Sequence, residues 1–96
     1  MLFALICTDK VNSLDLRQKS RPDHLKFLES LGSSLKAAGP FTDDEGSPTG
    51  SLVMIEAPNR SAIAEIAARD PYVIAGLFSS VEIKPWKWLI KNPEVK

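Results

Sequence analysis

The 96-residue chain has only one cysteine, Cys7, and only one histidine, His24. A single cysteine excludes a disulfide within the chain and is typical of a reducing compartment, so we expect a cytoplasmic protein. A structural zinc site needs about four nitrogen or sulfur ligands, and one histidine with one distant cysteine cannot supply them. We therefore expect neither a bound metal nor another cofactor.

The chain also lacks an excess of charge, because 12 acidic side chains balance 12 basic ones. Without net charge it has no long-range field that recruits nucleic acids or anionic membranes. The opening apolar run, residues 1–7, is too short to span a bilayer and lacks the basic lead and cleavage site of a secretion signal. The sequence contains no glycine-rich phosphate loop and no nucleophile elbow. We expect no nucleic-acid partner and no membrane partner.

What remains is the composition of an ordinary globular domain, with 44% hydrophobic and 25% charged residues. The length suits a single domain over residues 1–96 with one core. Hydrophobic patterning and turn signals predict its elements. In chain order they are a strand at 2–8, a helical turn from 12 or 13 to 17, a helix that starts or restarts at 20 and ends near 31 or 34, strands at 35–42 and 50–57, a helix from 59 or 61 to 69 or 70, and a strand at 78–90.

Two prolines limit the elements predicted in the second half of the chain. We expect Pro71 to stop the second helix, and Pro85 to force a bulge or an edge position in the last strand. The resulting order, βαββαβ, is the ferredoxin-like pattern of an α+β fold. It predicts a four-stranded antiparallel sheet with both helices on one face.

Both faces of the central strands are apolar in this pattern. In the first strand Leu2, Ala4 and Ile6 alternate with Phe3, Leu5 and Cys7, and in the third strand Leu52 and Met54 alternate with Val53, Ile55 and Ala57. A sheet covered on one side only should carry polar residues on its free face. Two helices cannot cover both faces, so we expect an identical chain to cover the second one, in a homodimer that joins sheet to sheet.

His24 occupies a position where an apolar residue is expected. In a helical frame, the apolar residues within roughly 60° of its direction, near the predicted start of the first helix, are Phe27, Leu28, Leu31 and Leu35. A buried imidazole must be hydrogen-bonded, and imidazoles exchange a proton near neutral pH, so His24 is the first candidate for catalysis. The alternative is a core histidine bonded to a backbone carbonyl.

Two carboxylates are candidate partners of His24. Asp70 points within about 20° of the buried Ile63 direction, at the end of the second helix, where the helix dipole disfavours a carboxylate. It could fix the imidazole as a general base, or simply bond nearby backbone groups. If the two helices run parallel, however, Asp70 lies far from His24, and Asp9 at the end of the first strand is the nearer carboxylate. Both alternatives stay open at this point.

Five further residues are candidates for ligand binding. Arg17 and Arg21 lie one helical turn apart and flank the histidine, where guanidinium groups suit a carboxylate or phenolate. The alternative for the arginines is pairing with local acids such as Asp15 and Asp23. The other three candidates are Gly39 and Pro40, which allow close backbone approach or end strand pairing, and Tyr72, which offers a phenol or packs in the core.

Five segments of the chain, taken in order, resemble the YciI-like (YCII-related) proteins. They are Arg-Pro-Asp-His-Leu at 21–25, Ala-Gly-Pro at 38–40, Asp-Pro-Tyr at 70–72, Ala-Gly-Leu-Phe at 75–78 and Val-Glu-Ile-Lys-Pro-Trp at 81–86. The resemblance implies a dimeric α+β barrel of ferredoxin-like subunits, similar in build to muconolactone isomerases. It also implies a histidine–aspartate site at His24 and Asp70, with Asp9 at a further acidic position. Some relatives are linked to dehydrochlorination of chlorinated aromatics.

These features together predict a small cytoplasmic enzyme that uses acid–base chemistry on a small anionic or aromatic molecule. His24 would transfer the proton, held by Asp70 or Asp9, and Arg17 or Arg21 would orient the substrate. Isomerisation, elimination and hydrolysis all fit this chemistry. The alternative from another class is a non-catalytic module that binds a small ligand or serves in dimerisation.

Overall fold

The structure is a computed structural model that describes residues 1–94. The chain follows the order β1-α1-β2-β3-α2-β4, with two short helices added, and this confirms the predicted ferredoxin-like α+β fold. The elements are β1 (Leu2–Asp9), α1 (Leu14–Ser30), a 3-10 helix (Gly32–Ser34), β2 (Leu35–Thr42), β3 (Pro48–Glu56), α2 (Arg60–Ala68), α3 (Pro71–Ile74) and β4 (Phe78–Pro85).

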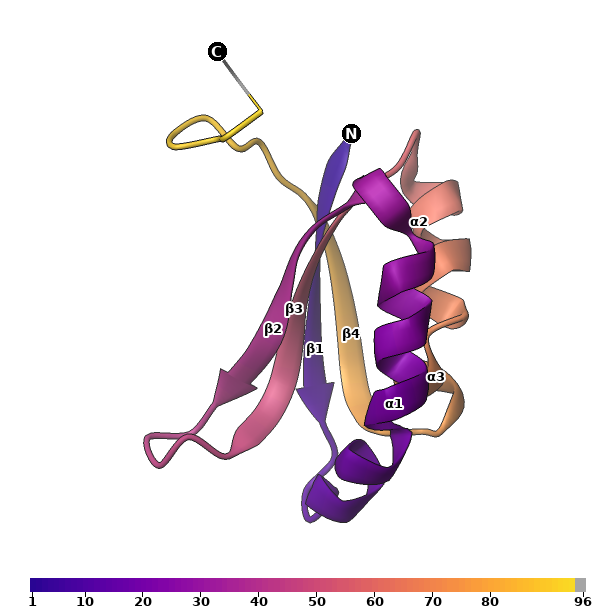
Figure 1. The fold of residues 1–96 in the computed structure, drawn as a ribbon, viewed down its shortest axis with the longest axis vertical. Coiled ribbons are helices and arrows are strands. Elements are labelled where there is room, and N and C mark those ends of the chain that lie inside the picture. The colour runs from indigo at the N-terminus through magenta and orange to yellow at the C-terminus, as the bar shows by residue number, and fades with distance from the viewer. Residues whose placement is uncertain (95–96) are drawn as a thin grey trace.

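The four strands form one sheet in the order β2-β3-β1-β4, and each adjacent pair is antiparallel. The helices all lie on one face of this sheet (Figure 1). Because β1 and β3 run in opposite directions, the helices that follow them, α1 and α2, also run in opposite directions. Our expectation of parallel helices was therefore wrong, and the segment that follows α2 lies beside the middle of α1.

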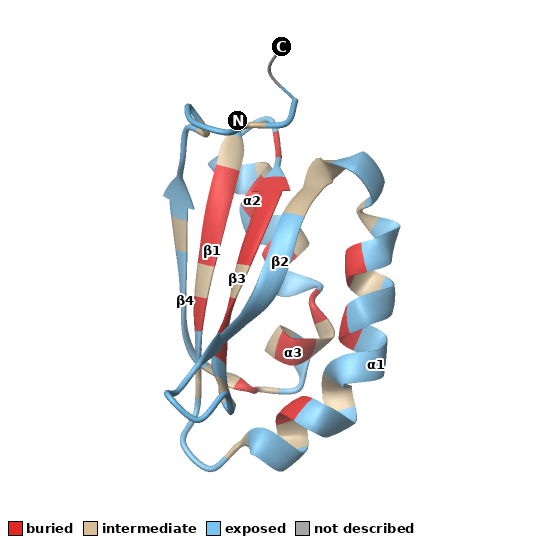
Figure 2. Cartoon of the chain, turned by 60° about the vertical axis from the view of Figure 1, so that its left-hand side comes forward, coloured by how far each residue is buried: buried red, intermediate tan, exposed pale blue. Residues whose placement is uncertain are grey.

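The core lies between the helices and the sheet. Its buried members are Phe3, Leu5 and Cys7 on β1, Val53, Ile55 and Ala57 on and after β3, Leu28 on α1, and Ile63 and Ala67 on α2. The period-two alternation of a strand brings the β1 and β3 members onto the face that the helices cover. Figure 2 shows that burial concentrates on these two central strands, whereas the edge strands β2 and β4 are largely exposed.

The opposite face of the central strands is also apolar, as the sequence pattern predicts. The register pairs Ala4 with Met54 and Ile6 with Leu52, so these side chains form one patch. The neighbouring Phe41 on β2 is 42% exposed. No helix of the described chain, residues 1–94, lies on this face, although within it Ala4 and Met54 are themselves only 8% and 7% exposed.

α1 differs from the prediction at its start. It begins at Leu14 and continues to Ser30 with Pro22 inside it, instead of starting or restarting at Ser20. Proline removes one backbone donor from a helix, but the burial of His24 and Leu28 against the rest of the domain holds the segment helical. His24 therefore lies in the second half of α1, not at its start.

The segment after α2 also differs from the prediction. α2 ends at Ala68, before the expected Arg69 or Asp70. Asp70 then caps the unpredicted helix α3, because its side chain accepts a hydrogen bond from the backbone N–H of Tyr72. Pro71 occupies the first turn of α3, where its missing N–H costs nothing, so this proline begins a helix.

β4 is an edge strand, as Pro85 suggests, but it ends at Pro85 and does not reach Ile90. Trp86 still donates its backbone N–H to the carbonyl of Leu2. Trp86 and Trp88 lie in the irregular segment beyond the strand, with ring centroids 5.9 Å apart. None of the helices described combines the length and the apolar character that crossing a bilayer requires.

Candidate active site

His24 and Asp70 lie in direct contact in the interior of the domain. Nδ1 of His24 is 2.8 Å from Oδ1 of Asp70, and the two residues are 6% and 7% exposed. An ionised carboxylate can only accept, so Nδ1 donates this bond and Nε2 is the nitrogen left for other partners. The antiparallel helices explain the contact, since they bring the α2–α3 junction to the middle of α1.

Tyr72 fixes the imidazole from its flat side. The two rings are stacked, with centroids 3.9 Å apart and planes 14° apart, and Phe78 meets the edge of the phenol at 5.8 Å. Burial raises the pKa of Tyr72, so its phenol stays protonated across the physiological range. The sequence left two alternatives for Tyr72, a phenol that lines a pocket or packing in the core. Both apply, because Tyr72 is fully buried and also lines the cavity.

Arg17 is held by Asp9, at the end of β1. Its Nη1 lies 2.9 and 3.0 Å from the two carboxylate oxygens, and its Nη2 donates a 2.6 Å hydrogen bond to Oγ of Ser51. The guanidinium also lies 4.9 Å from the ring centre of Tyr72. Asp9 therefore partners Arg17 and not His24, and the local acids Asp15 and Asp23 do not form this pair.

Ser51 is the polar residue of the candidate site that the sequence analysis missed. It lies on β3 at a position that faces the helices and is 3% exposed. One signal was available, because Ser51 precedes Val53 and Ile55 at period two and is the only polar member of that buried row.

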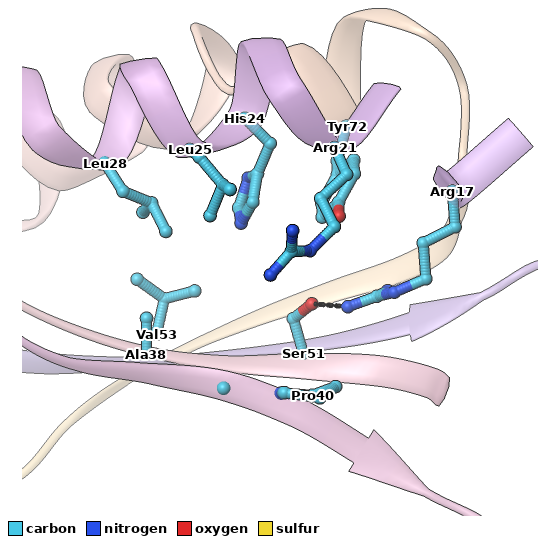
Figure 3. A pocket seen from close by; sticks show the side chains of 11 residues that line it. Arg17, Arg21, His24, Leu25, Leu28, Ala38, Pro40, Ser51, Val53 and Tyr72 are labelled. Atoms are coloured by element: carbon cyan, nitrogen blue, oxygen red, sulfur yellow. Dashed lines mark hydrogen bonds between the residues drawn. The ribbon is translucent and has the colours of Figure 1, made fainter. Parts of the chain in front are cut away.

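A cavity of about 190 Å³ opens between α1 and the sheet (Figure 3). Its lining residues are Arg17, Arg21, His24, Leu25 and Leu28 from α1, Ala38, Gly39 and Pro40 from β2, Ser51 and Val53 from β3, and Tyr72. A cavity of about 150 Å³ accepts a benzene ring, so this one suits a molecule with a single ring.

The cavity carries one cation without a local counter-charge. The side chain of Arg21 extends from α1 into the cavity (Figure 3), and within residues 1–94 it forms no ion pair. Asp70 does not line the cavity, since His24 and Tyr72 lie in front of it. Gly39 on β2 also lines the cavity, but a Cβ built there meets nothing within 4 Å. Close backbone approach therefore does not explain why this residue is a glycine.

Cys7 lies behind the site, buried under the helices. Burial, and then the negative charges of Asp70 and Asp9, raise its pKa from 9.0 to about 12. The thiol therefore stays protonated and is a weak nucleophile at neutral pH. In the described part of the chain, no group of three histidine, cysteine or acidic side chains is placed to hold a metal ion.

The fold and the site together define a class: a ferredoxin-like α+β domain with a buried histidine–aspartate pair beside a small, partly cationic cavity. The chain belongs to the YCII-related domain family, whose model matches residues 1–87. It is 38% identical to protein YciI from Escherichia coli O6:H1 over 95 residues, which cover 91% of this chain and 97% of that protein. An uncharacterized protein from Haemophilus influenzae is 37% identical over the same shares.

Solved structures agree with this family. A 5-chloro-2-hydroxyhydroquinone dehydrochlorinase, TftG, from Burkholderia phenoliruptrix AC1100 in complex with 2,5-dihydroxybenzoquinone superimposes with a TM-score of 0.82 and 30% identity, over 91% of this chain and 94% of that one. An antibiotic biosynthesis monooxygenase superimposes with a TM-score of 0.57 and 14% identity, over 93% and 99% of the two chains, and shares the fold alone.

Proposed function

We propose that this protein is an acid–base enzyme that acts on a small anionic molecule with a single ring. His24 is the proton-transfer group and Asp70 is the residue that positions it. The observation that carries the proposal is the buried 2.8 Å contact between Nδ1 and Oδ1 at the wall of a cavity. A general base needs a fixed orientation and a carboxylate that stabilises its protonated form, and Asp70 offers both.

The proton path follows from the geometry. With Nδ1 donating to Asp70, the lone pair of Nε2 is available to a proton of the bound molecule. The imidazolium that forms is stabilised by the carboxylate behind it. It then returns the proton to another atom of the molecule, for isomerisation, or to a leaving group, for elimination; the same pair could activate a water for hydrolysis.

The binding role falls to Arg21 more than to Arg17. The charge of Arg17 is matched by Asp9, whereas Arg21 extends into the cavity without an acidic partner among the described residues. The apolar side chains of Leu25, Leu28 and Val53 complete the walls and favour a ring. An anionic group on that ring would meet the guanidinium of Arg21.

Elimination is the reaction to test first. The 30% identical dehydrochlorinase TftG has a ring compound, 2,5-dihydroxybenzoquinone, in its structure, and this supports a ring ligand here. Elimination from a ring needs a base to take a proton and an acid to help the leaving group depart. His24 takes the two roles one after the other, first as the base and then, once protonated, as the acid.

We also propose a homodimer through the helix-free face of the sheet, in a reducing, cytoplasmic setting that suits the free Cys7. On this face Ile6 and Leu52 are half-buried and Phe41 is 42% exposed, and this supports the dimer, since exposed apolar surface marks an interface. Light scattering should give twice the 10.5 kDa chain mass. Phe41→Lys, at an exposed position of this face, should give the monomer, and a wild-type monomer at micromolar concentration would refute the dimer.

The experiment that tests the enzyme proposal is a screen of small ring acids, phenols and quinones with the wild type, His24→Gln and a surface control, Ser61→Ala. Each compound is followed for product formation and for a shift in melting temperature. We expect product with the wild type and Ser61→Ala and none with His24→Gln. Melting shifts without product for any compound would support a binding module instead.

A further inference from the structure

We propose that Ser51 is a second catalytic group, whose hydroxyl donates a hydrogen bond to the oxygen of the bound molecule that becomes negative as His24 takes a proton. This inference rests on the proposed function, since it assigns the partner of the base within the same cavity. It also narrows the ligand class to molecules whose acidic proton lies next to a carbonyl, or on a phenol.

The direction of the Ser51 hydroxyl follows from its one known partner. Oγ accepts a 2.6 Å hydrogen bond from Nη2 of Arg17, so one of its lone pairs is occupied. A hydroxyl also has one proton to donate. Among the residues that the structure describes, no acceptor takes that proton, although Ser51 is 3% exposed and lines the cavity. The acceptor that remains is a molecule in the cavity.

Arg17 strengthens Ser51 as a donor. A charged group that donates to Oγ draws electron density from the hydroxyl and makes its proton a better hydrogen-bond donor. Asp9 holds this guanidinium in place through both of its carboxylate oxygens. Arg17 and Asp9 are therefore positioning residues that act through Ser51.

The backbone of β3 sets the place of Ser51. Its neighbour Gly50 pairs with Thr8, and a Cβ added at Gly50 would collide with the backbone carbonyl of Cys7. The missing side chain lets β3 lie close against β1 at this point. This close approach brings Ser51 within reach of the end of the Arg17 side chain.

The base and the donor stand on opposite walls of the cavity. Figure 3 shows the imidazole of His24 pointing down from α1 and Ser51 pointing up from β3, with Arg21 between them. A ring held in this space has one edge toward Nε2 and another toward the hydroxyl. Removal of a proton conjugated with a carbonyl builds negative charge on the carbonyl oxygen, and a hydrogen-bond donor at that oxygen stabilises the charge.

The step is balanced within the bound molecule. A C–H or O–H bond of the molecule breaks, its proton forms a bond to Nε2 of His24, and the electron pair moves onto the carbonyl or phenol oxygen. Ser51 keeps its proton and only donates the hydrogen bond. Return of the proton from Nε2 to another atom, or to a leaving group, restores the neutral imidazole.

The test measures binding of 4-nitrophenolate, a stable mimic of the charged state, and of neutral nitrobenzene, to the wild type, Ser51→Ala and the control Ser61→Ala. A hydrogen bond to a charged oxygen predicts that Ser51→Ala weakens phenolate binding about tenfold or more. Nitrobenzene binding should stay the same in all three proteins. Equal phenolate affinity in Ser51→Ala and the wild type would overturn the assignment.

A second variant covers the case in which Ser51→Ala does not fold. Ser51→Cys keeps a similar shape with a weaker donor, so the absorption maximum of bound 4-nitrophenolate should move to longer wavelength than in the wild type. An unchanged spectrum would overturn the role of Ser51.

His24→Gln separates the two proposals, because it should bind phenolate normally yet lose turnover. Failure of the wild type itself to bind phenolate would overturn the ligand class as well.

Discussion

One carboxylate oxygen of Asp70 holds both the imidazole of His24 and the segment that carries the ring stacked upon it, Tyr72. Oδ1 lies 2.8 Å from Nδ1 of His24 and accepts the Tyr72 backbone N–H at 2.9 Å. The imidazole is therefore fixed at its edge by a hydrogen bond and on its face by a ring 3.9 Å away. These two contacts leave it one orientation, toward the cavity.

The stacking contact predicts different effects for two substitutions at Tyr72. Tyr72→Phe keeps the ring and should leave the free energy of unfolding and the imidazole orientation nearly unchanged. Tyr72→Leu loses the stack and leaves a space, at a cost of about 1 to 3 kcal/mol. Since the chain has one histidine and one tyrosine, nuclear Overhauser effects between the two rings are unambiguous. Their absence in the wild type would contradict the stacked arrangement.

The Asp9–Arg17 ion pair should contribute far more to stability than an exposed pair of the same length. Both Asp9–Arg17 and Lys36–Glu94 have an N···O distance of 2.9 Å. The side chains are 7% and 8% exposed in the first pair and 17% and 55% exposed in the second, in the order named. Asp9→Asn leaves a buried guanidinium without its counter-charge, so we expect a loss of about 3 kcal/mol.

Glu94→Gln is the matched control for this prediction. Neutralising an exposed partner should change the free energy of unfolding by at most about 1 kcal/mol. Urea unfolding at one protein concentration measures both variants, since a dimer would make stability depend on concentration. Similar losses in the two variants would show that burial does not set how much the Asp9–Arg17 pair contributes to the free energy of unfolding.

The raised pKa of Cys7 predicts a loss of stability in alkali. Burial and the nearby carboxylates hold this pKa at about 12 in the folded protein, against 9.0 for an ordinary thiol. Above pH 9.0 the unfolded chain releases the proton and the folded chain keeps it, so the free energy of unfolding falls by up to about 1.4 kcal/mol per pH unit from this group. Below pH 9.0 the thiol is protonated in both states, so Cys7 causes no loss in the free energy of unfolding there.

Cys7→Ala isolates this effect. The variant is expected to lose some packing energy at every pH, yet to lose the part of the alkaline slope that the thiol causes. Urea unfolding on both sides of pH 9.0 gives the two slopes for the wild type and the variant. Parallel slopes in the two proteins would mean that Cys7 titrates alike in the folded and unfolded states.

The fold could be predicted where local patterns decide it. Continuous apolar runs on β1 and β3, with the turn and cap signals between them, were enough for the element order of a ferredoxin-like domain. The start of α1 and the existence of α3 could not be predicted in the same way. Pro22 reads locally as a helix start, and only tertiary packing of His24 and Leu28 keeps it inside a longer helix.

Most of the polar residues at the candidate site could be named from the sequence, but their pairings could not. His24 and Asp70 stood out as polar groups on apolar stripes, but their contact depends on the opposite directions of α1 and α2, which we had taken as parallel. Arg17 was a candidate for substrate binding, with acids on its own helix as the alternative partners, but it pairs with Asp9 on β1. Ser51 was missed although its period-two spacing with Val53 and Ile55 was a signal, because its contact with Arg17 depends on tertiary structure that no local motif records.

The most direct test of the account is the exchange of substrate protons with solvent. The wild type and His24→Gln are incubated in D₂O with a panel of ring ketones and phenols, and carbon-bound deuterium is followed by NMR. We expect the wild type to exchange at least one compound and His24→Gln to do so about 100-fold more slowly or less. Exchange by His24→Gln at the wild-type rate would contradict the assignment of His24 as the proton-transfer group.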